Sequence, residues 1–107
     1  ANAIATIKPM MGKVSVMLKN DTNTRISYQA VTHTQVRYLE GGEKVTLKDI
    51  PTPVTITMVR EDKGLLRVMP MSSEEKGMLT ITLDEKTKFD NNQGVLRIQE
   101  DGQVFLN

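Results

Sequence analysis

The chain of 107 residues contains no cysteine. Without thiols it has no disulfide framework, no thiol nucleophile and no cysteine-ligated zinc site. Tryptophan is also absent, and aromatic residues make up only 4% of the chain. The hydrophobic core must therefore be aliphatic, with the seven methionines filling irregular gaps in it.

The chain also lacks an excess of charge and any long apolar run. Lys and Arg total 14 against 13 Asp and Glu, so the net charge is +1, and the charges are scattered singly. Nucleic-acid-binding domains usually gather positive charge on a stripe, so we expect no nucleic-acid partner. No apolar run approaches the roughly 20 residues of a transmembrane helix, so no transmembrane segment is expected.

His33 is the only histidine. A nucleophilic triad needs a base that titrates near neutrality, and the nearest acids to His33 in sequence are Asp21 and Glu40. No glycine-rich phosphate loop or carboxylate dyad accompanies it. We therefore predict a protein that is not an enzyme and holds no cofactor. A concave pocket with convergent polar groups around His33 or a tyrosine would reverse that prediction.

Apolar and polar residues alternate in many short segments. A period of two places every second side chain on one face of a sheet, so these segments predict half-buried strands. Turn-forming residues separate them at intervals of about ten residues, which is typical of an all-β sandwich; a small closed barrel is the alternative. The strands are expected at 13–19, 25–32, 34–39, 44–50, 53–60, 65–71, 78–84, 95–99 and 103–106.

The pattern predicts an antiparallel two-sheet sandwich, immunoglobulin-like, with seven to nine short strands. Its core should be formed by the inward-facing side chains of these strands. The expected core consists of Val14, Val16, Leu18, Ile26, Tyr28, Val45, Leu47, Ile56, Met58, Leu66, Val68, Leu79, Ile81, Leu83, Leu96, Ile98, Val104 and Leu106.

Residues 1–12 are expected to form an irregular segment before a sandwich domain at 13–107. Pro9 and Gly12 interrupt this segment, which can add an edge strand or wrap across a sheet face. Its first residues, Ala1-Asn2-Ala3, have the small-x-small form that precedes signal-peptidase cleavage. We therefore expect an exported protein, periplasmic or secreted; a chain boundary that falls there by chance is the alternative.

Turn residues fix some of the strand pairings. A three-residue loop with Gly102 in the left-handed region sets Ile98 opposite Val104, which gathers the aliphatic side chains on one face. Pro51 and Pro53 lack a backbone donor and predict an extended crossing from one sheet to the other.

Segment 53–71 is expected to form a hairpin that pairs Met58 with Val68. That register leaves apolar side chains on the outer face, and we predict that they form a patch that binds a protein partner or a second copy. Cover by the N-terminal residues Ile4, Ile7, Met10 and Met11 is the competing explanation. The predicted patch consists of Val59, Leu65, Met69, Met71 and Met78.

Methionine thioethers also suit Cu(I), which gives an alternative site. Its candidate ligands are Met10, Met11, Met69, Met71 and His33. Core filling or an apolar face explains the methionines more simply, so no metal is expected.

Three short segments carry weaker signals. Ser72–Glu75 fits a capping box and predicts one helical turn. A calcium loop that begins at Asp90 would require glycine at its sixth position, where Val95 stands, so Asp90–Gly94 predicts a plain turn. Asn20-Asp21-Thr22 fits an N-glycosylation acceptor, which matters only in a eukaryotic secretory pathway.

The succession of strands and turns resembles that of small exported bacterial β-sandwich domains of unknown function. The resemblance implies an immunoglobulin-like sandwich in the cell envelope and brings no functional residues; the Cys–Trp–Cys arrangement of true immunoglobulin domains is absent. The segments that carry it are 16–20, 26–29, 42–47, 52–56 and 64–68.

Two functions remain open at this point. One is a non-enzymatic binding or scaffold module of the bacterial cell envelope, which acts through a sheet edge or an apolar face. The other is an exported metal-handling protein that uses Met and His ligands for copper. The sequence names no partner and leaves the oligomeric state open.

Overall fold

The computed structural model describes residues 2–73, 77–86 and 94–107. These residues contain ten strands and no helix, and hence no helix long and apolar enough to cross a bilayer. The strands are β1 Ala5–Thr6, β2 Lys13–Asn20, β3 Ile26–Ala30, β4 Arg37–Leu39, β5 Lys44–Pro51, β6 Val54–Arg60, β7 Leu65–Ser72, β8 Met78–Lys86, β9 Val95–Ile98 and β10 Gln103–Leu106.

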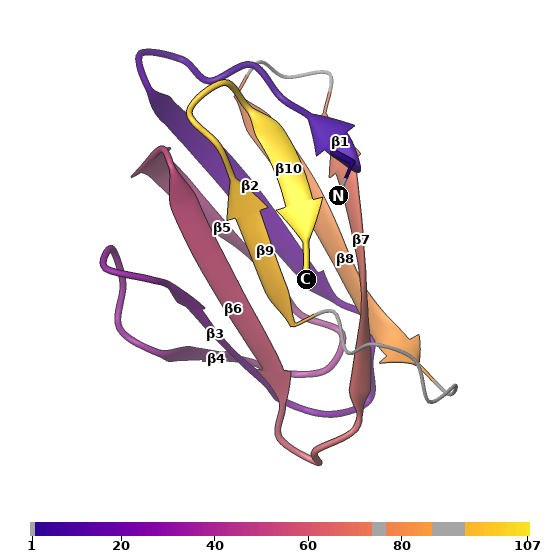
Figure 1. Ribbon diagram of the computed structural model, residues 1–107. Helices are drawn as coiled ribbons and strands as arrows, with labels where there is room; N and C mark the ends of the chain where they lie inside the picture. Colours follow the sequence, from indigo (N-terminus) through magenta and orange to yellow (C-terminus); the bar gives the residue numbers. More distant parts are fainter. Residues whose placement is uncertain (1, 74–76, 87–93) are drawn as a thin grey trace.

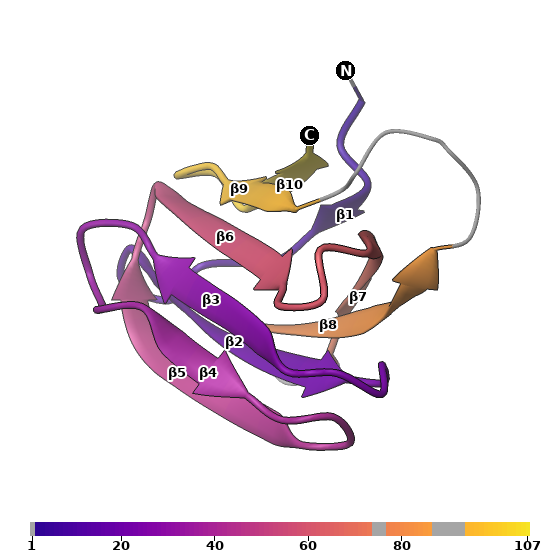
Figure 2. The same cartoon turned by 90° about the horizontal axis from the view of Figure 1, so that it is seen from below.

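The strands form two sheets packed face to face (Figures 1 and 2). One sheet has six strands in the order β1-β10-β9-β6-β3-β4, and the other has four in the order β5-β2-β8-β7. The all-β sandwich that the alternation predicted is confirmed. The strand count exceeds the expected seven to nine because the segment before residue 13 contributes the two-residue edge strand β1, paired to β10.

One pairing departs from the expected antiparallel arrangement. β2 and β8 run parallel, with Val16 opposite Leu79 and Leu18 opposite Ile81. The alternating pattern is the same for parallel and antiparallel neighbours, so periodicity alone could not reveal this. Both strands lie inside the four-stranded sheet, with β5 and β7 at its edges.

The core lies between the sheets and is almost entirely aliphatic. Every residue of the expected core is buried except Val45 and Leu106, which are half-buried against it. Burial of Ile7, Ala30, Leu39 and Ile50 was not anticipated. Each side chain of this size stabilises the fold by about 1.5–3 kcal/mol when it leaves water.

Two local predictions are confirmed by the register. Ile98 lies opposite Val104 in the β9–β10 hairpin, and Gly102 has a φ of +89°. A Cβ at Gly102 would overlap the carbonyl of Ile7, so glycine is required there for space as well as for conformation. The chain also passes from one sheet to the other at Pro51–Pro53, between β5 and β6.

The predicted pairing of Met58 with Val68 is wrong. Met58 pairs with Tyr28 of β3, whereas Val68 pairs with Leu83 of β8, so β6 and β7 belong to opposite sheets. The inward faces that the sequence proposed for the two strands are still buried. They meet across the core instead of side by side in one sheet.

Arg60 closes the arch between β6 and β7. Its side chain is only 10% exposed, its Nη1 donates to the Leu65 carbonyl at 2.7 Å, and its Nη2 lies 2.7 Å from Asp62 Oδ2. Asp62 Oδ1 in turn accepts from the backbone N–H of Gly64 at 2.9 Å. These contacts fold the connection into a bridge between sheets.

Ser72 belongs to β7, and its hydroxyl donates to the Thr6 carbonyl at 2.7 Å, so it does not begin a helix. The rest of that predicted turn, and the turn predicted at Asp90–Gly94 up to residue 93, lie outside the described residues.

Candidate functional site

The outer face of the six-stranded sheet presents two large exposed apolar side chains, Tyr38 and Val59. Alternation along β3, β4, β6, β9 and β10 points one set of residues into the core and the other set outward. The strand register groups the outward set into rows that cross the sheet. Figure 1 shows this sheet on the side that faces the reader.

One row contains Tyr38, Ser27 and Val59. Ser27 on β3 lies opposite Tyr38 on β4 and opposite Val59 on β6. Tyr38 and Val59 are each 56% exposed, which is high for side chains of their size. Because serine is small, it leaves the flanks of both larger side chains open to solvent.

Arg25, the residue before β3, joins this row. Its guanidinium lies 4.7 Å from the centre of the Tyr38 ring, a cation–π distance. Its Nε donates to Glu61 Oε2 at 2.6 Å, and Glu40 Oε2 lies 3.9 Å away. The hydrogen bond and charge of Glu61 raise the pKa of Arg25 above its ordinary value.

These side chains form one surface feature, which we name the Tyr38 patch. It combines an aromatic ring, a β-branched side chain, a guanidinium held in place and two carboxylates at its border. The Tyr38 patch consists of Arg25, Tyr38, Glu40, Val59 and Glu61.

The structure divides the patch that the sequence predicted. Val59 lies on the outer face of the six-stranded sheet, whereas Leu65, Met69, Met71 and Met78 belong to strands of the four-stranded sheet. The grouping was wrong because it relied on a β6–β7 hairpin that does not form. Met71 is 70% exposed, and the other three residues of the four-stranded sheet are half-buried.

The N-terminal segment does not cover either outer face. Ile7 enters the core between the sheets, with its N–H bonded to the Gly102 carbonyl at 2.9 Å. Ile4, Met10 and Met11 remain exposed. The competing explanation, cover of the patch by this segment, is therefore wrong, and the segment contributes the edge strand β1 to the six-stranded sheet.

The candidate copper ligands lie on separate elements. Met10 and Met11 belong to the turn before β2, His33 lies between β3 and β4, and Met69 and Met71 lie on β7. β4 and β7 lie at opposite sides of the sandwich (Figure 2). Among the described residues, no cluster of three or more His, Asp or Glu side chains is placed to hold a metal ion.

A shallow polar depression of about 450 Å³ does surround His33. Thr34 is engaged within its own turn, since its Oγ1 accepts from the Ala30 N–H at 3.1 Å and donates to the Gln35 carbonyl at 2.9 Å. No carboxylate lines the depression to orient the imidazole, so a catalytic triad cannot be assembled from its lining. The lining residues are Gln29, Thr32, His33, Thr34, Gln35 and Arg37.

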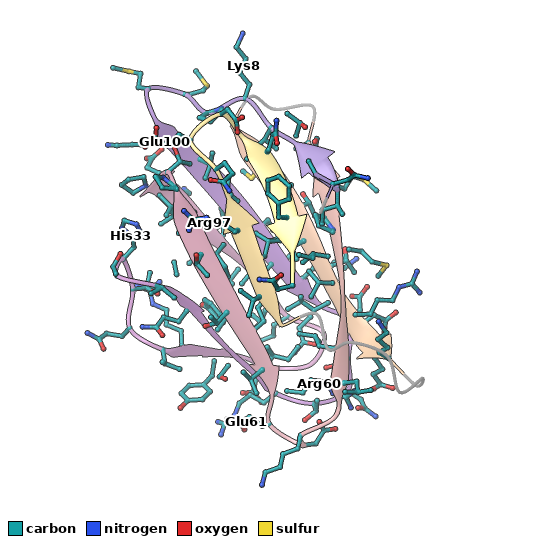
Figure 3. The ribbon with its side chains drawn as sticks, viewed as in Figure 1. Lys8, His33, Arg60, Glu61, Arg97 and Glu100 are labelled. Carbon is teal, nitrogen blue, oxygen red and sulfur yellow. The ribbon has the colours of Figure 1, made fainter. Side chains whose placement is uncertain are left out.

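A second depression of about 480 Å³ lies beside the β9–β10 turn, where Figure 3 labels Glu100. Asp101 Oδ1 accepts from the Gln103 N–H at 3.1 Å, so this carboxylate stabilises the turn. The lining residues are Pro53, Gln99, Glu100, Asp101, Gln103 and Phe105.

Asn20 and Thr22 form a buried polar network that sequence reasoning missed. Asn20 Nδ2 donates to the carbonyls of Thr24 and Leu39 at 2.9 and 3.0 Å, and Asn20 Oδ1 accepts from the Thr22 hydroxyl at 2.7 Å. The Asn20 amide is fully buried, so it is closed to glycosylation in the folded protein. The network ties the end of β2 to the end of β4 across the two sheets.

Comparisons with known proteins show a similarity of fold but no match by sequence. No protein family and no curated protein matches the sequence. Among solved structures, a bacterial adhesin from Mobiluncus mulieris containing intramolecular disulfide, isopeptide and ester bond cross-links matches with a TM-score of 0.50 and 13% identity. A second crystal form of that adhesin gives a TM-score of 0.47 and 14% identity.

The adhesin match covers 71% of this chain and 42% of the adhesin chain, so less than half of the adhesin corresponds to this domain. At this identity the likeness shows a common all-β fold. The disulfide of the adhesin has no counterpart here because this chain has no cysteine.

Proposed function

We propose that this domain is a non-enzymatic binding module of an exported bacterial protein, and that it binds a protein partner through the Tyr38 patch. The observation that carries the proposal is the row in which Tyr38 and Val59 are both more than half exposed on a well-formed sheet. Export and the immunoglobulin-like subclass are parts of the same proposal; the adhesin fold supports them.

The composition of the Tyr38 patch supports protein binding. Tyrosine and arginine are the residues most enriched at the energetic centres of protein interfaces. Arg25 is held by Glu61 and by the Tyr38 ring before any partner arrives. A side chain that is already ordered loses less rotamer entropy on binding, so more of the contact energy contributes to affinity.

The His33 depression supports the absence of catalysis. Its lining provides an imidazole without a carboxylate partner and a Thr34 hydroxyl that stabilises its own turn. Binding chemistry needs only the donors and acceptors that are there, whereas general base catalysis needs an oriented imidazole.

The test compares two charge substitutions on opposite sheets. Wild type, Val59→Glu and Met71→Glu are immobilised separately, and bound proteins from envelope extract of the source cells are identified by mass spectrometry. A partner that Met71→Glu retains and Val59→Glu loses is then purified, and its affinity is measured for wild type and Tyr38→Ala. We expect Tyr38→Ala to weaken binding by roughly tenfold or more.

The opposite pattern overturns the proposal. A partner lost by Met71→Glu and retained by Val59→Glu would place the interface on the methionine face of the four-stranded sheet. Equal capture by all variants would place it on neither face. Circular dichroism on each variant checks that the fold is intact, since both substituted residues lie on outer faces.

A further inference from the structure

The depression around His33 has a consistent chemical character. All six residues that line it carry hydrogen-bonding side chains, and none of them is acidic or apolar. Figure 3 shows His33 at the side of the ribbon, on the connection between β3 and β4. A surface hollow with only polar lining favours a small, strongly hydrated ligand over an apolar one.

The turn that forms this depression is held in a defined shape. The N–H groups of His33 and Thr34 both donate to the Ala30 carbonyl at 2.9 Å. Gln29 Nε2 donates to the Thr34 carbonyl at 3.2 Å, which ties the neighbouring strand to the turn. Thr32 holds a left-handed φ of 69°. Such a turn presents its remaining polar groups in fixed positions.

Arg37 is the charged group in this lining that lacks a partner. Arg25 and Arg60 each form an ion pair, whereas no carboxylate of the described residues pairs with Arg37. A guanidinium presents a planar fork of donors that matches a carboxylate with two parallel hydrogen bonds. The neighbouring imidazole of His33 adds a further donor.

We propose that this depression binds an acidic sugar, meaning a sugar residue that carries a carboxylate. Arg37 receives the carboxylate. The amides of Gln29 and Gln35 and the hydroxyl of Thr32 offer donors and acceptors to the ring hydroxyls. The volume of about 450 Å³ lies in the range of small-molecule sites, roughly 300–1,000 Å³.

The uniform polar lining is what favours a sugar acid over an acidic peptide. A peptide carboxylate arrives on an apolar stem beside backbone amides, and the depression has no apolar side chain to receive that stem. A sugar acid surrounds its carboxylate with hydroxyls, which the amide and hydroxyl groups of the lining complement. A simple carboxylate would use Arg37 and His33 but make no contact through ring hydroxyls with the amides and the Thr32 hydroxyl of the lining.

The single histidine makes the test sharp. The His33 Cε1–H resonance of the whole chain is followed by NMR at fixed pH and ionic strength during titration with sodium glucuronate, glucose or sodium acetate. We expect a saturable shift with glucuronate, binding of acetate weaker by roughly tenfold or more, and no shift with glucose. Equal responses to glucuronate and acetate, equal responses to glucuronate and glucose, or no response to glucuronate would each overturn the proposal.

Variants assign the site and separate it from the Tyr38 patch. Arg37→Gln should weaken glucuronate binding by roughly tenfold or more, because it removes the charge-assisted pair. Arg67→Gln removes an exposed arginine from β7 of the other sheet and should leave binding unchanged. Val59→Glu should also leave it unchanged, so the two proposals can fail independently. Full binding by Arg37→Gln would refute the assignment.

Discussion

The two outer faces of the sandwich differ in how they treat large side chains. On the six-stranded sheet, Tyr38 and Val59 stand more than half exposed. On the four-stranded sheet, Met17, Met69 and Met78 are half-buried, and only Met71 is strongly exposed among the methionines of its strands. Side-chain size does not explain this difference, because methionine is intermediate in size between valine and tyrosine.

Position in the strand order accounts for the contrast between Met17 and Met71. Met17 lies between Thr46 of β5 and Thr80 of β8, so neighbours cover it on both sides. Met71 lies beside Thr80 on the edge strand β7 and has a paired strand on one side only. Val59 belongs to a central strand, and within the described residues the β6–β9 register pairs β6 as far as Thr57, two residues earlier. Met69 lies on the same edge strand and is half-buried, so the edge position permits the exposure of Met71 but does not by itself impose it.

The largest expected effect contrasts the inside of a strand with its outside. Leu18→Ala should cost about 3 kcal/mol of unfolding free energy, because it opens a cavity between the sheets. Met17→Ala, one residue away on the outer face, should cost less than about 1 kcal/mol. Urea unfolding of both variants measures the difference, and equal losses would show that the outer face is packed against something.

The second prediction concerns the polar link between the sheets. Asn20→Ala should cost about 2 kcal/mol, because it removes the Asn20 donor from the buried Leu39 carbonyl and one of the two side-chain donors from the Thr24 carbonyl. Asn23→Ala, in the same turn and exposed, should cost less than about 0.5 kcal/mol. Thermal or urea unfolding tests this, and a neutral Asn20→Ala would mean that the Asn20 network does not stabilise the contact between the two sheets.

A pair of charge substitutions on the outer face of the four-stranded sheet tests whether coverage by neighbouring strands decides how exposed a side chain is. Met17→Glu places a carboxylate between two covering threonines and should cost about 1–2 kcal/mol. Met71→Glu, at the open edge, should change stability by less than about 0.5 kcal/mol. If the two variants lose equal stability in urea unfolding, coverage by neighbours does not decide exposure here.

The smallest effect is expected at the arch that joins the faces. The backbone N–H of Gly64, together with Arg60, lowers the pKa of Asp62 below its ordinary value. The stability that the ionised Asp62 carboxylate contributes is present above its unfolded pKa of about 3.9. It is lost as the pH falls through the lowered pKa of the folded state. Thermal scans of wild type and Asp62→Asn are recorded from pH 6 down to about pH 2. The difference in Tm between the two proteins should become smaller as the pH falls. A Tm difference that does not change with pH would show that the ionised Asp62 carboxylate does not stabilise the fold.

The alternating pattern was enough to predict the strands and the core. The alternation predicts that side chains such as Val16, Ile56 and Ile81 point inward, and all three are buried in the structure. Periodicity reports which face a residue takes, but it contains no information on which strand lies beside it. That is why the core was predicted well while the β6–β7 pairing was wrong.

The candidate site depends on the information that periodicity lacks. Val59 was recognised as outward, but its neighbours could be found only from the β3–β4 and β3–β6 registers. Tyr38 stood in a predicted strand, and Arg25 gave no signal because its partner Glu61 lies far along the chain. Long-range pairing created the Tyr38 patch, and no local sequence pattern encodes such pairing.

The parallel pairing of β2 with β8 also constrains the order in which the chain can fold. β2 is synthesised before β8, so one of its two edges has no partner until residues 78–86 have been made. Contacts so distant along the chain are slow to form, because a long loop must close before they are gained. During that interval the nascent chain presents an open strand edge, a template for pairing with other chains. Cells that make this protein at high levels should therefore depend on chaperones that shield β2.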